Sequence, residues 1–253
     1  MIAGMKAFIG CSGFSYKDWK GVFYPEGMPQ KNWFAYYCSQ FNCLEINSSF
    51  YKYPSEKLLK KWHEESPGDF RFSIKMNRLI THFKKLVDCG RPLNDFYDLV
   101  RNHLKEKAGC ILFQFPPGFS FNEERLRAIL DLSNNGFTNA GEFRNLSWFS
   151  GEVLEEFGKA GLIFCGQSQP GELPDDPFIS GPAAYYRFHG KSVLFKSRYG
   201  VNELKAVAGT LKKAKTSFIF FNNTWGDSAI YNAREMQAII TTKKKGLKAC
   251  HPL

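Results

Sequence analysis

The most constraining feature of this sequence is a regular alternation of two patterns along its whole length. Short runs rich in β-branched and aromatic residues recur about every 30 residues, and helical patterns fill most of the gaps between them. This order predicts an α/β fold, and eight repeats within 253 residues match a single (β/α)8 TIM-like barrel. The expected strands are Lys6–Cys11, Leu44–Asn47, Phe70–Met76, Cys110–Phe115, Ala140–Arg144, Leu162–Cys165, Ala184–His189 and Phe218–Asn222.

We expect one domain over residues 5–253, preceded by a short N-terminal extension at residues 1–4. Two gaps depart from the alternation. Ser12–Met28 is rich in aromatic residues and Gly, which predicts a long loop after the first strand. Gly166–Pro182 contains four prolines and no helical period, so the sixth helix is expected to be short or missing. The expected helix N-caps are Ser55, Asn122, Asn202 and either Asp227 or Ser228.

Composition excludes several classes of protein. No run of about 18 apolar residues is present, so no membrane span is expected. The first residues lack the pattern of a secretory signal peptide, and the seven cysteines never form a C-x-x-C motif. We therefore expect a cytoplasmic protein whose thiols are structural, without disulfides or a zinc site. The formal net charge of +10 indicates a surface that attracts anions of many kinds.

Polar residues stand near the carboxyl ends of the expected strands, at positions where a buried strand is usually apolar. Because strand side chains alternate between faces, residues two apart share one face. In a (β/α)8 barrel the carboxyl ends of the strands form the mouth where ligands bind. The pairs or single residues are Glu45 with Asn47, Ser73 with Lys75, Gln114, Glu142 with Arg144, Arg187 with His189, and Asn222.

A purely structural explanation stays open for these residues. Single polar residues at strand ends are commonly turn residues, and ion pairs such as Glu45 with Lys75, or Glu142 with Arg187, would neutralise the cluster. Burying charge costs several kcal/mol for each unpaired ion. Because the pattern recurs on six strands, we favour a ligand site.

Motifs in the same order as the strands resemble the YecE-like family, a TIM-barrel domain of unknown function. The resemblance implies a barrel of about this length and no established activity. The sequence departs from the family pattern in two places: Cys11 stands where Thr is usual, and the segment Gly166–Pro170 lacks an expected Asp. The matching segments begin with Gly10-Cys11-Ser12-Gly13-Phe14-Ser15-Tyr16, followed by Trp19, Gly21 and Phe23-Tyr24-Pro25, then 44–51, 72–75, 80–82, 112–117, 142–144, 147–148, 186–190, 221–223 and 232–233.

The residue types at the strand ends permit acid–base chemistry. Glu45 and Glu142 are candidates for a general acid and base, with Glu142 preferred as the base because Arg144 would stabilise its charged form. Lys75 is expected to act as an electrophile or as a Schiff-base amine, and Lys75 or His189 would stabilise developing negative charge. The expected substrate-binding residues are Arg144, Arg187, Asn47, Gln114, Asn222, His82 and Trp148.

The sequence predicts an enzyme that acts on a small anionic metabolite, sugar- or nucleotide-like and either phosphorylated or not, at the barrel mouth. A hydrolase, isomerase or lyase fits such a site. No cofactor is expected, because the sequence has no nucleotide-binding or metalloprotease motif. Glu45, Glu142 and His189 are residue types that could ligate a divalent metal, but no metal is expected, since lysine and arginine beside the carboxylates disfavour a cation. The alternative is a protein that binds or processes nucleic acid with its basic, aromatic-rich surface, and weak non-specific binding is compatible with both.

Overall fold

The structure is a computed structural model that describes residues 5–241. The expected N-terminal extension and residues 242–253 of the expected domain lie outside the described residues. The strands are β1 (Lys6–Cys11), β2 (Cys43–Ile46), β3 (Arg71–Lys75), β4 (Ala108–Gln114), β5 (Asn139–Glu142), β6 (Ile163–Phe164), β7 (Gly166–Ser168), β8 (Ala183–Phe188) and β9 (Thr216–Phe221). The α-helices are α1 (Trp33–Gln40), α2 (Glu56–Glu65), α3 (Gly90–Leu104), α4 (Glu123–Leu130), α5 (Gly151–Lys159), α6 (Val201–Leu211) and α7 (Ser228–Thr241).

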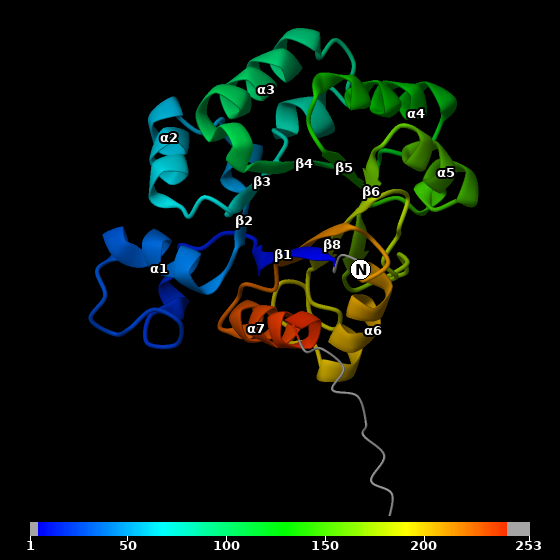
Figure 1. Cartoon of the computed structure of the whole chain (residues 1–253). Helices are drawn as coiled ribbons and strands as arrows, with labels where there is room; N and C mark the ends of the chain where they lie inside the picture. Colours follow the sequence, from blue (N-terminus) through cyan, green and yellow to red (C-terminus); the bar gives the residue numbers. More distant parts are fainter. Residues whose placement is uncertain (1–4, 242–253) are drawn as a thin grey trace, which may run out of the picture.

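The strands of the described chain form two parallel sheets. One sheet has the order β1-β9-β8-β7 and the other the order β2-β3-β4-β5-β6. Figure 1 shows the strands around a common centre, with the helices on the outside. The sheets approach each other at two places: an isolated bridge joins Ser12 to Glu45, and Cys165 alone separates β6 from β7 along the chain. The expected α/β class with parallel strands is confirmed, whereas the hydrogen bonding gives two sheets and no closed barrel among the described residues.

The expected positions of the elements agree closely with the structure. Each expected strand overlaps an observed one, and β1 has the bounds predicted for it. The loop after β1 contains a single 3-10 turn, Lys17–Trp19, before Gln30, and no helix lies within residues 169–182. Both irregular gaps are therefore confirmed. The short strand β7 was not expected, because the prolines that follow it gave the whole segment the composition of a loop.

The helix N-termini test the expected caps one by one. Ser55 accepts a hydrogen bond from the backbone of Leu58, and Asn122 accepts one from Arg125, so both caps are confirmed. The last helix begins at Ser228, one of the two starts expected. The expected cap at Asn202 is wrong: Gly200 is the N-cap of α6, and the carboxylate of Glu203 accepts from the Gly200 N–H.

Two hydrophobic clusters reflect the two faces of the strands. The larger one joins strand residues to residues of the helices and of the long loop after β1. The smaller one contains no helix residue, which places it on the strand faces that turn away from the helices. Its buried members are Phe8, Cys43, Cys110, Leu112, Ala140, Ile163, Cys165, Tyr185, Phe218 and Phe220.

The smaller cluster explains why the polar residues point inward. Leu112 and Gln114 are two apart on β4, and Tyr185 and Arg187 are two apart on β8, so each pair shares one face. The inner face is therefore apolar along most of the strands and becomes polar at their carboxyl ends.

Two further expectations concern the state of the cysteines and the absence of membrane-spanning helices. Six of the seven cysteines lie within the described residues, where all six are buried and free, and Cys250 lies outside. Burial raises the pKa of thiols such as Cys11 and Cys110, which keeps them protonated and unreactive. Within residues 5–241, the helices are too short or too polar to cross a lipid bilayer.

Candidate functional site

A cavity of about 790 Å³ opens at the carboxyl ends of the strands. Many of the predicted site residues converge there, as the alternation of strand faces requires. Its floor is polar and its walls are aromatic, which is the usual composition of a small-molecule site. The predicted residues that line it are Asn47, Lys75, Gln114, Arg144, Arg187, His189 and Asn222.

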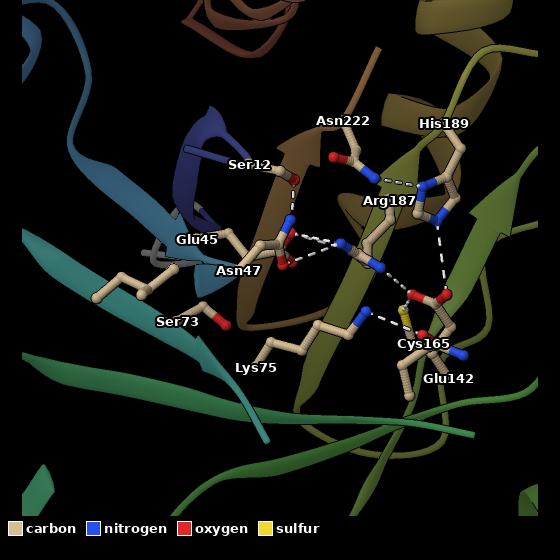
Figure 2. A network of polar contacts seen from close by, with 12 residues as sticks. Ser12, Glu45, Asn47, Ser73, Lys75, Glu142, Cys165, Arg187, His189 and Asn222 are labelled. Carbon is tan, nitrogen blue, oxygen red and sulfur yellow. Dashed lines mark hydrogen bonds and ion pairs between the residues drawn. The ribbon is translucent and has the colours of Figure 1, made fainter. Parts of the chain in front are cut away.

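Arg187 lies at the centre of the polar floor, between two glutamates from the other sheet (Figure 2). Its Nη2 donates to Oε1 of Glu45 over 2.6 Å, and its Nη1 donates to Oε2 of Glu142 over 2.7 Å. All three side chains are at most 1% exposed. Arg187 therefore links β8 to both β2 and β5, and its guanidinium compensates charge that would be costly to bury alone.

Glu45 lies beneath the cavity and has further partners. Ser12 and Tyr185 each donate a hydroxyl hydrogen bond of 2.5 Å to its two oxygens. Tyr185 also contacts the hydroxyl of Ser73. Because every oxygen of Glu45 already accepts a hydrogen bond, this carboxylate is a structural centre for three strands.

Glu142 forms the second carboxylate of the floor. Arg144 donates to its Oε1 through Nε over 2.7 Å and also through Nη2. Burial by itself would raise the pKa of Glu142, but Arg144 and Arg187 hold that pKa well below its usual range. A carboxylate stabilised in this way is a weak base, which argues against the expected role of Glu142 as the general base.

His189 follows β8 and lies between Arg144 and Asn222. Nη2 of Arg144 is 3.0 Å from its Nε2, and the carboxamide of Asn222 is 2.9 Å from its Nδ1. A guanidinium can only donate, so Nε2 accepts and the ring proton is on Nδ1. The Asn222 carboxamide must then face Nδ1 with its oxygen, since its Nδ2 can only donate. Burial and the neighbouring Arg187 lower the pKa of His189 to about 3, which agrees with a neutral ring.

Lys75 differs from the arginines because it has no acidic partner within salt-bridge distance in the part of the chain that the structure describes. Its Nζ donates to the neutral Oε1 of Gln114 over 2.9 Å and lies 4.1 Å from the centre of the Phe50 ring. Burial and the charge of Arg187 lower the pKa of Lys75 to about 8. Lys75 is thus a cation whose charge the site leaves uncompensated.

Two predicted substrate-binding residues do not line the cavity. The prediction for Trp148 is wrong: its ring is fully buried, stacks on Phe143 and Phe119, and donates its Nε1–H to the Phe119 carbonyl. His82 is adjacent to the site, where its ring contacts Phe50 edge-on at 4.8 Å. Burial and Lys75 lower the pKa of His82 to about 4.

The aromatic wall is the part of the cavity that the sequence did not assign to the site. Tyr51 and Trp225 are 67% and 66% exposed, an unusual state for such large rings. Both residues lie a few positions after a strand end, and that position was the available signal. The unassigned lining residues are Tyr16, Asp18, Phe50, Tyr51, Pro117, Gln169, Phe195, Thr224 and Trp225.

The donor set of the floor does not suit a metal ion. Both glutamates are held by arginines, and a cation would have to displace these partners. Among residues 5–241, no three His, Cys, Asp or Glu side chains are grouped as metal ligands.

Comparison with protein families identifies the family of this chain. The family model described as "Protein of unknown function DUF72" matches residues 8–252. The chain belongs to the DUF72 family. The UPF0759 protein YunF of Bacillus subtilis is 27% identical over 275 aligned positions, covering 95% of this chain and 96% of YunF. The UPF0759 protein YecE of Escherichia coli K12 is 28% identical over 127 positions, covering 50% of this chain and 46% of YecE. The resemblance to a YecE-like family is confirmed.

Solved structures agree with this placement in DUF72. A DUF72 family protein from Thermotoga maritima MSB8 has a TM-score of 0.83 at 27% identity, covering 94% of this chain and all of that one. A D-psicose 3-epimerase with D-tagatose, from Clostridium cellulolyticum H10, has a TM-score of 0.52 at 11% identity, covering 93% of this chain and 97% of that one. At that identity the likeness to the epimerase concerns the fold alone.

Proposed function

We propose that this DUF72 protein is an enzyme that binds a small anionic metabolite, sugar- or nucleotide-like, in the cavity and converts it by acid–base chemistry. The observation that carries the proposal is the charge balance of the floor. At the buried floor, Lys75, Arg144 and Arg187 stand against Glu45 and Glu142, and Lys75 has a neutral partner in place of a counter-ion. Asp18 also lines the cavity, but its side chain is exposed and forms no ion pair with these cations within residues 5–241. A bound anion would supply the missing negative charge.

The roles follow from which polar atoms remain free. Arg187 is engaged by two carboxylates, so we assign it to the framework of the site. Arg144 uses Nε and Nη2 on Glu142 and His189, and its Nη1 has no hydrogen-bond partner within residues 5–241. Lys75 and Arg144 would therefore bind the anion, and Lys75, whose pKa is lowered to about 8, would move protons. Glu142 would orient Arg144 and His189. A hydrolase, isomerase or lyase is compatible with this arrangement.

We also propose that the two sheets belong to one (β/α)8-type barrel and that residues 5–253 form one domain. In support, β6 of one sheet and β7 of the other are separated only by Cys165, so together they would form one interrupted barrel strand. At the other junction between the sheets, the Ser12–Glu45 bridge connects the end of β1 to β2. With these two junctions, the described strands follow one another around the centre in their chain order, from β1 to β9, and β9 pairs with β1. One cooperative urea transition, seen equally by circular dichroism and tryptophan fluorescence, is expected; two separate transitions would contradict a single domain.

We do not favour the nucleic-acid alternative. A nucleic-acid groove needs a continuous exposed stripe of cations, whereas the distinctive charges here lie at strand ends around one cavity. The aromatic side chains of the cavity wall could stack on the planar or sugar-like skeleton of a small molecule as well as on the bases of a nucleic acid, so they do not favour the alternative.

A thermal-shift and calorimetry series tests the proposal. Inorganic phosphate, ribose 5-phosphate and AMP are titrated into the wild-type protein, with ribose as the uncharged comparison. We expect at least one anion to raise the melting temperature and ribose to have no effect. Lys75→Gln should lower the affinity at least tenfold. The matched variant Lys57→Gln, on the exposed face of α2, should leave it unchanged. Equal affinity in both variants would contradict the proposed site.

A further inference from the structure

We propose that the Lys75 amine forms an imine with the carbonyl group of its substrate, so that the substrate class is an aldehyde or ketone that carries an anionic group. The inference rests on the proposed function, since it concerns the same cavity, and it adds a covalent role for one residue.

Lys75 is distinguished from the other lysines by its surroundings. An exposed lysine such as Lys159 has two glutamate partners that raise its pKa, so its amine stays protonated and unreactive. The buried Lys107 donates to the carbonyls of His63 and Ser66 and to the Ser66 hydroxyl, so its nitrogen is fully occupied. Lys75 lines an open cavity, and its one hydrogen-bond partner within residues 5–241 is the neutral oxygen of Gln114.

These surroundings favour a nucleophilic amine. With its pKa lowered to about 8, about a tenth of Lys75 is neutral at pH 7, far more than for a lysine with an ordinary pKa. Nζ of Lys75 lies 4.1 Å from the centre of the Phe50 ring, which covers one side of the nitrogen but carries no negative charge that would hold the amine in its protonated form. Partial burial and neighbouring positive charge are the conditions that activate amines toward carbonyl groups.

The chemical step balances without any added oxidant or reductant. The nitrogen lone pair attacks the carbonyl carbon, the C=O π pair moves to oxygen, and a proton passes from nitrogen to that oxygen to give a carbinolamine. Protonation of its hydroxyl from solvent releases water, and the nitrogen lone pair forms the C=N bond. The resulting iminium carries one positive charge, as the ammonium did. It would keep the cation–π contact with Phe50 and an N–H directed at Gln114.

The same geometry explains why the substrate should be anionic. Arg144 lines the cavity together with Lys75, and its Nη1 has no hydrogen-bond partner within residues 5–241. This nitrogen would bind the anionic group of a substrate whose carbonyl group reacts with Lys75. The aromatic rings of Phe50, Tyr51 and Trp225 line the same cavity and would contact the carbon skeleton.

The test uses pyridoxal 5′-phosphate as the probe, because it combines an aldehyde with a phosphate, and pyridoxal as the matched probe without phosphate. Each is incubated with the full chain at a series of pH values on either side of the pKa of Lys75, reduced with sodium borohydride, and located by peptide mass spectrometry. We expect preferential labelling of Lys75 by the phosphate form, a rise in labelling with pH centred near 8, the pKa of Lys75, and competition by inorganic phosphate. Lys75→Arg should remove this label, and Lys196→Arg, at the exposed rim over Trp225, should not.

The outcomes separate the two proposals. Labels spread evenly over exposed lysines, with Lys75 unmodified while phosphate still stabilises the protein, would overturn the imine and leave the anion site standing. No labelling of Lys75 together with no effect of any anion would overturn both. Because the labelling profile is measured on the wild-type chain, the test does not depend on the folding of a variant.

Discussion

At the scale of single residues, Arg187 sets the stability of the site. It is 1% exposed and forms ion pairs with two carboxylates that are themselves fully buried. Replacing Arg187 would leave Glu45 buried without a cationic partner in the described chain and would leave Glu142 with Arg144 alone.

Replacing this guanidinium should therefore be costly. We expect Arg187→Met to lower the free energy of unfolding by about 3–5 kcal/mol, measured by urea denaturation. Arg198→Met, which breaks the exposed pair with Asp227, should change it by less than about 1 kcal/mol. Adding Glu45→Gln and Glu142→Gln to Arg187→Met should restore part of the loss. A small effect of Arg187→Met alone would contradict the buried network.

The titrating residues of the site predict the pH dependence of stability. The pKa of His189 is lowered in the folded protein to about 3 from 6.5, so between these values the unfolded chain binds more protons and stability falls as the pH falls. The pKa of Glu142 is also depressed, so its contribution is present at neutral pH and is lost in acid.

We expect the urea midpoint to decrease steadily as the pH is lowered from about 7 to about 4, the interval over which the unfolded chain gains these protons. In His189→Gln this decrease should be smaller, because Gln has no proton to gain. Identical pH profiles for the wild-type protein and His189→Gln would show that His189 is not buried in its neutral form.

Residue patterns predicted much of the site and missed its wall. The two-residue period of a strand was enough to place Lys75, Glu142 and Arg187 together, because that period is a property of the backbone. Loop residues have no such period, so the position of Trp225 shortly after a strand end was too weak a signal to assign its side chain to the cavity. Trp148 follows a strand end about as closely as Tyr51 does, but Tyr51 lines the cavity whereas Trp148 is fully buried, a difference that depends on packing.

At the scale of elements, the agreement depends on local signals. Caps such as Ser55 and Asn122 were predictable because the capping hydrogen bond lies within three residues. The start of α6 was missed because Gly200 offers no side chain to recognise. The interruption at Cys165, where β6 ends and β7 begins in the other sheet, was not predicted. It depends on pairing with β5 and β8, which are distant in the sequence.

The short segment around Trp148 gives a prediction at this scale. Because the ring packs against Phe119, Phe121 and Phe143, Trp148→Ala should lower the free energy of unfolding by about 3–5 kcal/mol. The anion affinity of the folded variant, measured by calorimetry below its melting temperature, should remain within about threefold of wild type, a margin of less than about 1 kcal/mol. A specific loss of affinity without loss of stability would return Trp148 to the binding site.

At the scale of the whole molecule, the net charge of +10 predicts some nucleic-acid binding at low salt. We expect this binding to be weak, independent of sequence and steeply reduced between about 50 and 200 mM salt, because it arises from counterion release. Fluorescence anisotropy with labelled single- and double-stranded oligonucleotides measures it. A sequence-specific complex that persists at about 200 mM salt would favour the nucleic-acid alternative over a small-molecule enzyme.

The central claim is that the uncompensated charge at the strand ends forms an anion site. The most direct test is a crystal soaked with a dilution series of selenate, whose anomalous scattering locates the bound anion whatever the natural substrate is. We expect the strongest and most persistent peak inside the cavity, within hydrogen-bond distance of Lys75 Nζ or Arg144 Nη1. Peaks confined to exposed lysines, with none in the cavity at any concentration, would contradict the claim.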